Sequence, residues 1–427
     1  MLIDFRVKNF RSFKDWATFS MVADEKVELP QNTFEAGGLT LLKTAAIYGA
    51  NASGKSNLIR AMQRFFRLIL DSYNTNRVKQ PIPEYDPFLL GAETKTQPIE
   101  FEVRLLMGGV IYRYGVAFNR KEIVEEWLFE KKKKEIQLFM RTQNRIELSK
   151  KFGKEVAVPA NGIGPEFLLL SFSALNEGIS RSIVEEVRKN TIILDDFDIR
   201  FHGFITSDFV HRSGAARKDA CRLLTSADLN IKSIQIIDRS LPESLVQEFK
   251  NNVPDSEQAA VLETVKRQES IHCMHPVFDI EGREAGEIPF PLAQESEGTK
   301  RLFAFTEPIY ATLESGGALV VDELDASLHP LLQEHLVKLF QDPQTNPKNA
   351  QLIFTTHSTE ILNNRLFRRD QVWFAEKDDL GATELFSLLE IKGVRKDLSY
   401  GKNYLLGTFG AVPKLKSLKT TGHDKVK

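Results

Sequence analysis

The chain has 427 residues, 42% of them hydrophobic, which is enough for roughly two or three domains with large apolar cores. Its 57 lysine and arginine residues balance 58 aspartate and glutamate residues, so the net charge of -1 gives no global indication of nucleic-acid binding. Two cysteines, Cys221 and Cys273, cannot form a disulfide framework and are typical of a reducing cytosol. The sequence has no long apolar run and no signal-peptide core, so we expect a cytoplasmic protein with no membrane contact.

The N-terminal segments predict strands followed by a helix. LIDFRVKNF, which starts at residue 2, alternates apolar and charged residues, as a strand with one buried face does. LLKTAAIYG, residues 41–49, is mostly apolar and predicts a buried strand, whereas SNLIRAMQRFFRLIL, residues 56–70, repeats its apolar residues at helical spacing. We therefore expect a strand, a short loop and a helix in direct succession.

The loop between that strand and helix fits the phosphate-binding pattern G-x-x-x-x-G-K-[ST]. In such a loop the glycines let backbone N–H groups turn towards phosphate oxygens, the lysine carries charge to the β and γ phosphates, and the serine hydroxyl binds Mg²⁺. The order of strand, loop and helix makes a glycine turn of another kind the weaker alternative. The predicted nucleotide-binding residues here are Gly49, Asn51, Ala52, Ser53, Gly54, Lys55, Ser56 and Asn57.

Two β-hairpins are predicted after this helix. IEFEVRLLMGGVIYRYGVAF, residues 99–118, reads as two strands joined at Gly108 and Gly109. EEWLFEKKKKEIQLFMR, residues 125–141, reads as a second hairpin, and its run of four lysines is typical of a solvated tip rather than a binding patch. We expect an antiparallel sheet beside the nucleotide-binding core.

The middle of the chain, about residues 175–270, is polar and predicts helices with no chemical motif. The helical segments are SRSIVEEVRKN, AARKDACRLLTSADLN and PESLVQEFKNNVPDSEQAAVLETVKRQES. HCMH, residues 272–275, places three possible metal ligands in four residues. It lacks a second cluster at zinc-site spacing, so chance is the better explanation than a metal site.

Two apolar strands in the second half end in polar residues. GGALVVDELD predicts a buried strand over residues 318–321 that ends in Asp322 and Glu323. An acid at such a strand end can hold Mg²⁺, and a second acid beside it can orient or deprotonate an attacking water, the alternative being a solvated acidic pair. AQLIFTTHS carries His357 out of the next strand. Strand ends of one parallel sheet line one crevice, so His357 is predicted to contact a γ-phosphate, although a lone histidine is more often structural.

The segment LAQESEGTKRLFAF lies upstream of the acidic pair. Ser296, Gly298 and Lys300 precede an apolar helix that is predicted over residues 302–310. A serine and a glycine at a helix start form another device for binding anions, because the N–H groups of the first turn point outward. We expect this turn to contact phosphate.

Taken in order, these motifs resemble those of the ATP-binding-cassette ATPases, specifically the heads of the RecF, SMC and OLD kind. The P-loop is followed by a signature, SEGTK, then by the acidic pair, a D-loop ELDASLHP that contains Asp325, and a switch histidine in TTHS. The opening VKNFRSF resembles the NF(R/K)SF opening of these heads, in which an arginine, here Arg11, lies close to the nucleotide. The signature departs from the SGGQ of transporters, and the middle of the chain is unmatched.

The resemblance implies an α/β fold: a P-loop NTPase head of the ABC type, with a mixed or parallel core sheet, an N-terminal antiparallel β subdomain and a helical insertion. The predicted division is an N-terminal ATPase lobe over residues 1–174, the helical insertion over 175–270, and a C-terminal ATPase lobe over 271–427. The implied cofactors are ATP and Mg²⁺. Ser56 and Asp322 would hold the metal, and Glu323 and His357 would be catalytic.

The same resemblance implies a homodimer, or a higher homo-oligomer, with ATP between two heads. Each nucleotide would contact Lys55, Ser56, Asp322 and Glu323 of one chain and Ser296 with Gly298 of the other, while Asp325 would couple the two sites. Binding and hydrolysis would then close and open the dimer as a conformational switch.

Two functions remain open at this point. The compact chain resembles bacterial ATPases of the RloA/AbiL type, which implies a sensor in a two-gene anti-phage system that controls a separate nuclease or toxin effector from the same operon. The alternative is a DNA-repair or recombination ATPase of the RecF/SMC kind that clamps DNA. The C-terminal PKLKSLKTTGHDKVK has five lysines and one aspartate and makes DNA contact possible.

Overall fold

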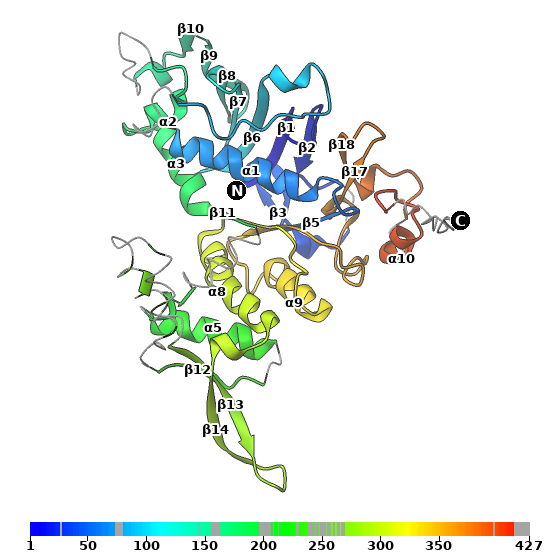
Figure 1. Ribbon diagram of the computed structural model, residues 1–427. Coiled ribbons are helices and arrows are strands. Elements are labelled where there is room, and N and C mark those ends of the chain that lie inside the picture. Colours follow the sequence, from blue (N-terminus) through cyan, green and yellow to red (C-terminus); the bar gives the residue numbers. More distant parts are fainter. Residues whose placement is uncertain are drawn as a thin grey trace, which may run out of the picture.

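The computed structural model contains four β-sheets in its described part, with helices between and around them (Figure 1). The sheets have seven, six, three and two strands. The structure describes residues 1–413 except 26–27, 73–79, 144, 155–162, 196–205, 208, 212, 228–229, 238–243, 245–246, 248–252, 254–257, 259–260, 263–264, 266–269 and 396–397.

The seven-stranded sheet is antiparallel and confirms both predicted hairpins. Its order is β10-β9-β8-β7-β6-β1-β2. Gly108 and Gly109, with φ of 54° and 76°, form the turn between β6 and β7, a conformation that glycine adopts without strain. Lysines 131–134 are exposed at the β8–β9 tip. The strands are β1 (Leu2–Lys8), β2 (Ala17–Ser20), β6 (Ile99–Met107), β7 (Val110–Phe118), β8 (Ile123–Lys131), β9 (Glu135–Thr142) and β10 (Arg145–Leu148).

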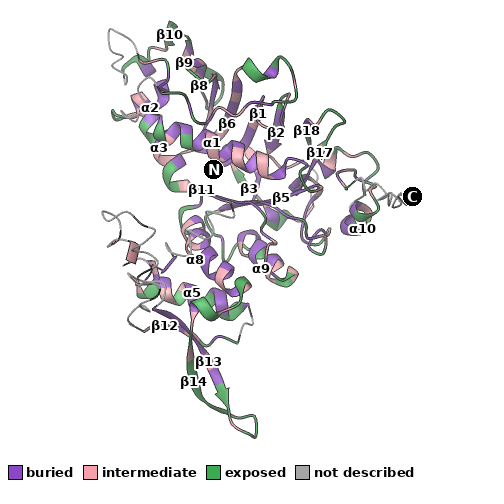
Figure 2. Cartoon of the chain, viewed as in Figure 1, coloured by how far each residue is buried: buried purple, intermediate pink, exposed green. Residues whose placement is uncertain are grey.

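The six-stranded sheet forms the core that carries the P-loop. Its order is β11-β15-β16-β5-β17-β18, and all neighbours are parallel except β17 and β18. β5, β15 and β16 are buried at every residue, which explains why their sequences are mostly apolar. Figure 2 shows the buried residues of β5. The strands are β5 (Thr44–Tyr48), β11 (Thr191–Leu194), β15 (Ala318–Val321), β16 (Gln351–Thr355), β17 (Val372–Lys377) and β18 (Thr383–Ser387).

Helix α1 (Lys55–Asp71) packs between the two large sheets. Its Phe65 contacts Phe5 of β1, Phe101 of β6 and Tyr114 of β7, with ring centroids 5.4–5.9 Å apart. Ile59 and Met62 of the same helix share one apolar cluster with residues of both sheets. The helix that follows the P-loop is therefore held by the antiparallel sheet as well as by the core sheet.

The second apolar cluster lies below the core sheet in Figure 1, around two helices of the C-terminal half. Helix α8 (Glu297–Ser315) buries Leu302, Phe303 and Phe305, and the helix predicted over residues 302–310 is thereby confirmed. Helix α9 (Pro330–Gln341) contributes Leu336, and α10 (Tyr400–Leu405) follows near the C-terminal end.

A smaller unit projects from this half. Helix α5 (Gly214–Ser226) packs on α8 and on β12 (Ser233–Ile236). β12 pairs with β13 (Ile271–Phe278), and β13 forms a long hairpin with β14 (Glu284–Pro291) that extends away from the core (Figures 1 and 2). HCMH lies in β13, where His272 and Cys273 are buried and His275 Nε2 bonds Glu295 Oε1 at 2.8 Å. Among the described residues, no group of His, Cys, Asp and Glu side chains could hold a metal ion.

The segment 175–270 differs from the predicted helical insertion. Helix α3 (Ile179–Asn190) packs on α1 and α2 (Leu169–Ser173), and β11 joins the core sheet beside β15. Leu194 O accepts a hydrogen bond from Asp322 N at 2.8 Å, so β11 supports the strand end that carries the acidic pair. The sequence of β11, TIIL, is too short to show a period, and the helical pattern before it concealed the strand. Most of the predicted helix over 242–270 lies outside the described residues.

The remaining elements are short. They are β3 (Thr33–Ala36) and β4 (Leu39–Leu42), which pair with each other, and the 3₁₀ turns η1 (Pro30–Asn32), η3 (Thr94–Thr96), η4 (Phe152–Lys154), η5 (Leu292–Gln294), η6 (Arg369–Gln371) and η7 (Leu388–Glu390). In the part of the chain that is described, none of the helices has the length and apolar character needed to cross a membrane.

Candidate functional site

The P-loop follows β5 directly and ends where α1 begins. Gly54 has φ of 115°, and a Cβ there would lie 2.2 Å from Thr383 Oγ1 of β18. A Cβ on Gly49 would lie 2.4 Å from Ala375 O of β17. Both positions require glycine because neighbouring strands press against the loop. The loop is thus shaped by β17 and β18, which the motif itself does not include.

Lys55 is buried at the base of this loop. Its Nζ donates to Gly49 O at 2.8 Å and to Ala50 O at 3.0 Å. Burial lowers its pKa to about 8, and the charges of Asp322, Glu323 and Asp325 offset only part of this effect. Lys55 is therefore a desolvated cation, and an anion placed beside it would stabilise its charged form. Phosphate oxygens in the loop would supply that anion.

Ser56 and Asp322 meet beside Lys55. Ser56 Oγ donates to Asp322 Oδ1 at 3.1 Å, and Thr355 Oγ1 donates to the same oxygen at 2.6 Å. A hydroxyl and a carboxylate are hard oxygen ligands of the kind that Mg²⁺ takes alongside water and phosphate. The two predicted metal ligands are brought together, and their chemistry fits that ion.

Glu323 lies at the end of β15 in a left-handed conformation, with φ of 55°. Its backbone is held on both sides: its N–H donates to Thr355 Oγ1 at 2.7 Å, and its carbonyl accepts from Arg301 Nη2 at 2.7 Å. A non-glycine residue in this region costs about 1–3 kcal/mol, and such strain is typical of functional sites. The held backbone leaves the exposed carboxylate at the mouth of the site.

His357 and Asp325 are joined across the same strand ends. The backbone N–H of His357 donates to Asp325 Oδ2 at 3.0 Å. Desolvation and the positive charge of Lys55 lower the pKa of His357, which favours the neutral imidazole, and a neutral imidazole can donate a hydrogen bond through one nitrogen. Asp325 therefore positions the switch loop of its own chain. Its predicted contact across a dimer stays a prediction.

The signature turn caps α8. Ser296 Oγ accepts from Thr299 N at 3.1 Å, and Ser296 itself is exposed. Lys300 Nζ pairs with Glu297 at 3.0 Å within the same turn. A Cβ on Gly298 would lie 2.7 Å from Ser327 O of the D-loop, so glycine lets the two loops touch. Among the described residues, no hydrogen bond joins this turn to the P-loop of the same chain.

Arg11 lies on the other side of the P-loop helix. Its Nε pairs with Asp86 at 2.6 Å, and Arg11 and Asn57 line the same hollow of about 360 Å³. Ser12 connects this region to the loop, because its Oγ accepts from Asn57 Nδ2 at 2.8 Å. Arg11 is therefore next to the predicted nucleotide site, although its present partner is a carboxylate.

The remaining P-loop residues differ in exposure. Asn51 and Ala52 are exposed at the tip of the loop, and Ala52 has φ of 61°. Ser53 is buried, and its Oγ has no hydrogen-bond partner among the described residues. A buried hydroxyl of this kind inside the loop fits a phosphate-binding site, because a phosphate oxygen can accept its hydrogen bond.

Three residues of the site were missed by sequence reasoning. Thr355 lies within TTHS, where no local pattern indicates a role for it, although it contacts both Asp322 and Glu323. Arg301 follows the signature directly and holds the Glu323 backbone. Thr383 gives no sequence signal at all: its Oγ1 donates to Ser53 O at 2.7 Å from 330 residues away.

A comparison with protein-family models matches residues 45–363, well over half of the chain, to a family described as "AAA domain, putative AbiEii toxin, Type IV TA system". The chain belongs to this family. It contains an AAA domain, and its α/β fold is that of a P-loop ABC-type head, as the order of motifs predicted.

Solved structures that match this chain at low structural similarity include two SMC heads and a component of an ABC transporter complex. The SMC head domain from Thermotoga maritima is 15% identical, with a TM-score of 0.42, and the match covers 90% of this chain and 98% of that one. The SmcHead bound to the C-winged helix domain of ScpA is 13% identical, with a TM-score of 0.43 and coverage of 90% and 97%. The cbiO1 protein from Clostridium perfringens, part of the ABC transporter complex cbiONQ, is 12% identical, with a TM-score of 0.30 and coverage of 91% and 90%. A search of curated proteins found no match.

The lowered pKa of Lys55 makes nucleotide affinity depend on pH. Below about pH 8 the lysine is charged before and after binding, so this group adds no pH dependence. Above about pH 8 a proton must be taken up on binding, and the affinity for ATP should fall by up to about tenfold per pH unit. Dissociation constants measured from about pH 7 to 9.5 check this. In the Lys55→Arg variant, whose charge does not titrate here, the profile should be flat, and a flat profile in the unmodified chain would contradict the prediction.

Proposed function

We propose that this chain binds ATP with Mg²⁺ between the P-loop and the ends of β15 and β16, and hydrolyses it. The observation that carries this proposal is the meeting of Lys55, Ser56 and Asp322 at the carboxyl ends of neighbouring parallel strands. Glu323 and His357 lie at the same edge. Switch-point crevices of this kind are where α/β sheets bind their ligands.

The roles follow from the geometry. Lys55 exchanges its carbonyl contacts for β- and γ-phosphate oxygens. Ser56 and Asp322 would hold Mg²⁺, and the ion would supply positive charge that neutralises phosphate charge. Glu323 orients a water molecule and accepts its proton. His357, whose lowered pKa favours the neutral imidazole, donates a hydrogen bond towards the γ-phosphate. The loop residues Gly49, Asn51, Ala52, Ser53, Gly54 and Asn57 surround the phosphates, and Arg11 lies close to the nucleotide.

The second half of the site comes from another copy of the chain. Ser296 is exposed and the signature turn is not bonded to its own P-loop in the described structure, which supports a role in trans. Two chains pair head to tail, so that Ser296, Gly298 and Lys300 contact the partner's nucleotide. Hydrolysis removes the γ-phosphate contacts and opens the dimer, which makes the cycle a conformational switch.

Glu323→Gln should retain ATP binding but lower kcat by about 10²–10⁴-fold, because only the water-orienting carboxylate is lost. This variant should accumulate as an ATP-loaded dimer in size-exclusion chromatography, whereas Lys55→Ala should bind no ATP. Glu314→Gln, an exposed glutamate of α8, is the matched control and should hydrolyse ATP normally. Hydrolysis by Glu323→Gln at the rate of the unmodified chain would exclude Glu323 as the base.

Ser296→Arg should bind ATP as a monomer yet hydrolyse it poorly, because the added cation occupies the place of the γ-phosphate contact in trans. Mixing Ser296→Arg with Lys55→Ala then distinguishes a site shared between two chains from a site formed by one chain alone. A mixed dimer keeps one intact composite site, so activity should recover in part. No recovery, with mixed dimers shown by mass spectrometry, would mean that each chain hydrolyses ATP alone.

In the cell, we propose that this switch is the sensor of a two-gene anti-phage system of the RloA/AbiL type and controls a separate nuclease or toxin. The family description names a type IV TA system, which supports a role in a multi-gene system of this kind. The alternative is a RecF/SMC-like ATPase that clamps DNA. A nuclease gene beside this one would favour the first function, and recombination genes would favour the second.

The effector-binding surface is expected on α5. α5 packs on α8, the helix that begins at the signature, so a partner on α5 can sense the state of the site. Arg217→Ala with Lys218→Ala on α5 should weaken binding of the adjacent gene product at least tenfold in a pull-down, with ATPase activity unchanged. Arg188→Ala with Lys189→Ala on α3 is the matched control. Loss of salt-sensitive DNA binding instead would favour the DNA-clamp function.

A further inference from the structure

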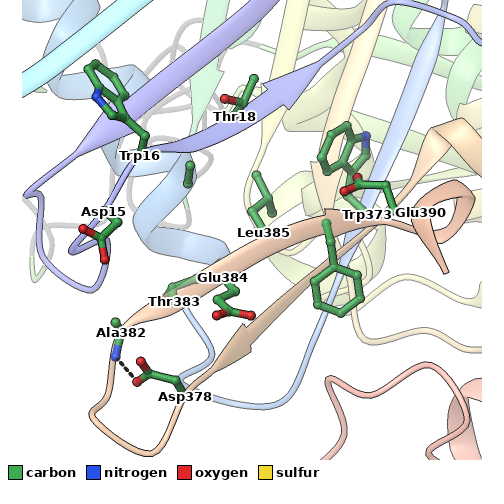
Figure 3. A pocket seen from close by; sticks show the side chains of 12 residues that line it. Asp15, Trp16, Thr18, Trp373, Asp378, Ala382, Thr383, Glu384, Leu385 and Glu390 are labelled. Carbon is green, nitrogen blue, oxygen red and sulfur yellow. Dashed lines mark hydrogen bonds between the residues drawn. The ribbon is translucent and has the colours of Figure 1, made fainter.

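A hollow of about 600 Å³ lies between β2 and β18, and neither Glu323 nor His357 lines it (Figure 3). Asp15, Trp16 and Thr18 line one side, and Glu384 and Phe386 line the other; we call it the β2–β18 groove. β2 is the last strand of the seven-stranded sheet, and β18 is the last strand of the six-stranded sheet. Two sheet edges therefore face the same space, and such edges favour an extended peptide as their ligand.

The groove is acidic and aromatic. Its lining includes four carboxylates, and it includes no lysine or arginine. Two of the carboxylates are bonded to nearby backbone: Asp378 accepts from Ala382 N at 2.7 Å, and Glu390 accepts from Ser387 N at 2.8 Å. Asp15 and Glu384 are exposed on opposite sides of the groove. The surface therefore complements a segment that alternates basic and apolar residues.

We propose that the C-terminal segment of this same chain, residues 414–427, binds the β2–β18 groove. These residues lie outside the described structure, and their sequence, KLKSLKTTGHDKVK, has five lysines, one aspartate and apolar residues between them. The lysines carry the charge opposite to that of the groove carboxylates. Leu415 and Leu418 can make apolar contacts with its aromatic side chains.

The position of the last described residues, close to β17 and β18, supports the C-terminal segment as the ligand of the groove. Ala411 is buried, and its carbonyl accepts from Tyr404 OH at 3.1 Å, so the chain is anchored up to this point. Gly410 lies against Glu376 of β17, and Glu376 pairs across the hairpin with Glu384 of the groove. Fourteen further residues span up to roughly 45–50 Å when extended, far more than the width of one hairpin. The tether gives the segment a high effective concentration at the groove.

The groove also contacts the P-loop through one residue. Thr383 lines it, donates through Oγ1 to Ser53 O at 2.7 Å, and donates through its backbone N–H to Ser12 O at 2.7 Å. A segment that shifts β18 therefore shifts the carbonyl of Ser53. This consequence rests on the proposed nucleotide site, whereas binding of the segment to the groove does not.

The first test is zero-length carbodiimide cross-linking of the full chain at low concentration, with peptides identified by mass spectrometry. Lysines of 414–427 should cross-link to Asp15 or Glu384 within one chain, and mixtures of isotopically light and heavy chains distinguish links within a chain from links between chains. Links only between chains would show that a second copy is the occupant and would overturn the proposal. Links from these lysines to other sites, with none to the groove, would overturn it as well.

The second test replaces the five lysines of 414–427 with glutamine in the full chain and measures hydrogen exchange. Backbone amides of residues 15–20 and 383–387 should exchange at least fivefold faster than in the unmodified chain. A matched control replaces lysines 131–134, the exposed β8–β9 tip, with glutamine and should leave these amides unchanged. Equal exchange in the tail variant and the unmodified chain would overturn the proposal.

The affinity for ATP, measured on the same lysine-to-glutamine variant of residues 414–427, tests separately whether the segment acts on the P-loop through Thr383. A shift of threefold or more in the dissociation constant is expected if the segment acts on the P-loop. If neither chain binds ATP, the proposed function fails while the cross-linking and exchange results still decide where the segment binds. If ATP binds equally to both chains, the segment does not act on the P-loop, and that part of the inference is overturned.

Discussion

The hydroxyl of Thr355 holds together the parts on which the nucleotide site depends. It donates to Asp322 Oδ1 and accepts from Glu323 N, which fixes the end of β15 against the end of β16. Asp322 also accepts from Ser56 at the start of α1, 266 residues away in sequence. A hydroxyl can make both contacts because it is donor and acceptor at once. An apolar residue of the same size would leave the carboxylate and the N–H without these partners.

The parallel register of the core sheet makes this meeting possible. β15, β16 and β5 are neighbours in that order, so the chain leaves all three strands at one edge of the sheet. The loops that follow carry the acidic pair, the switch histidine and the P-loop. β11 pairs with β15 at this edge, and the Leu194 carbonyl accepts a hydrogen bond from the Asp322 N–H. The site is thus a property of the whole sheet rather than of one motif.

Elements outside the motifs contact this site through few residues. Arg301 of α8 reaches the Glu323 carbonyl, so the helix that begins at the signature also fixes the backbone of the proposed base. Thr383 of β18 reaches the Ser53 carbonyl from the other side. α5 packs on α8, and the β2–β18 groove lies beside Thr383. Partners at either place would act on the site through short, defined contacts.

The sequence determined the P-loop, the buried strands around it, both β-hairpins and the order of the motifs, because these depend on local spacing of glycine, charge and apolar residues. Only the tertiary structure decided that β11 belongs to the core sheet, and that Thr355, Arg301 and Thr383 complete the site. Their contacts join segments far apart in the chain, and a threonine or arginine at a strand or helix end has no local pattern that distinguishes it. The pKa of Lys55 was likewise decided by burial, which appears only once both lobes are packed around the loop.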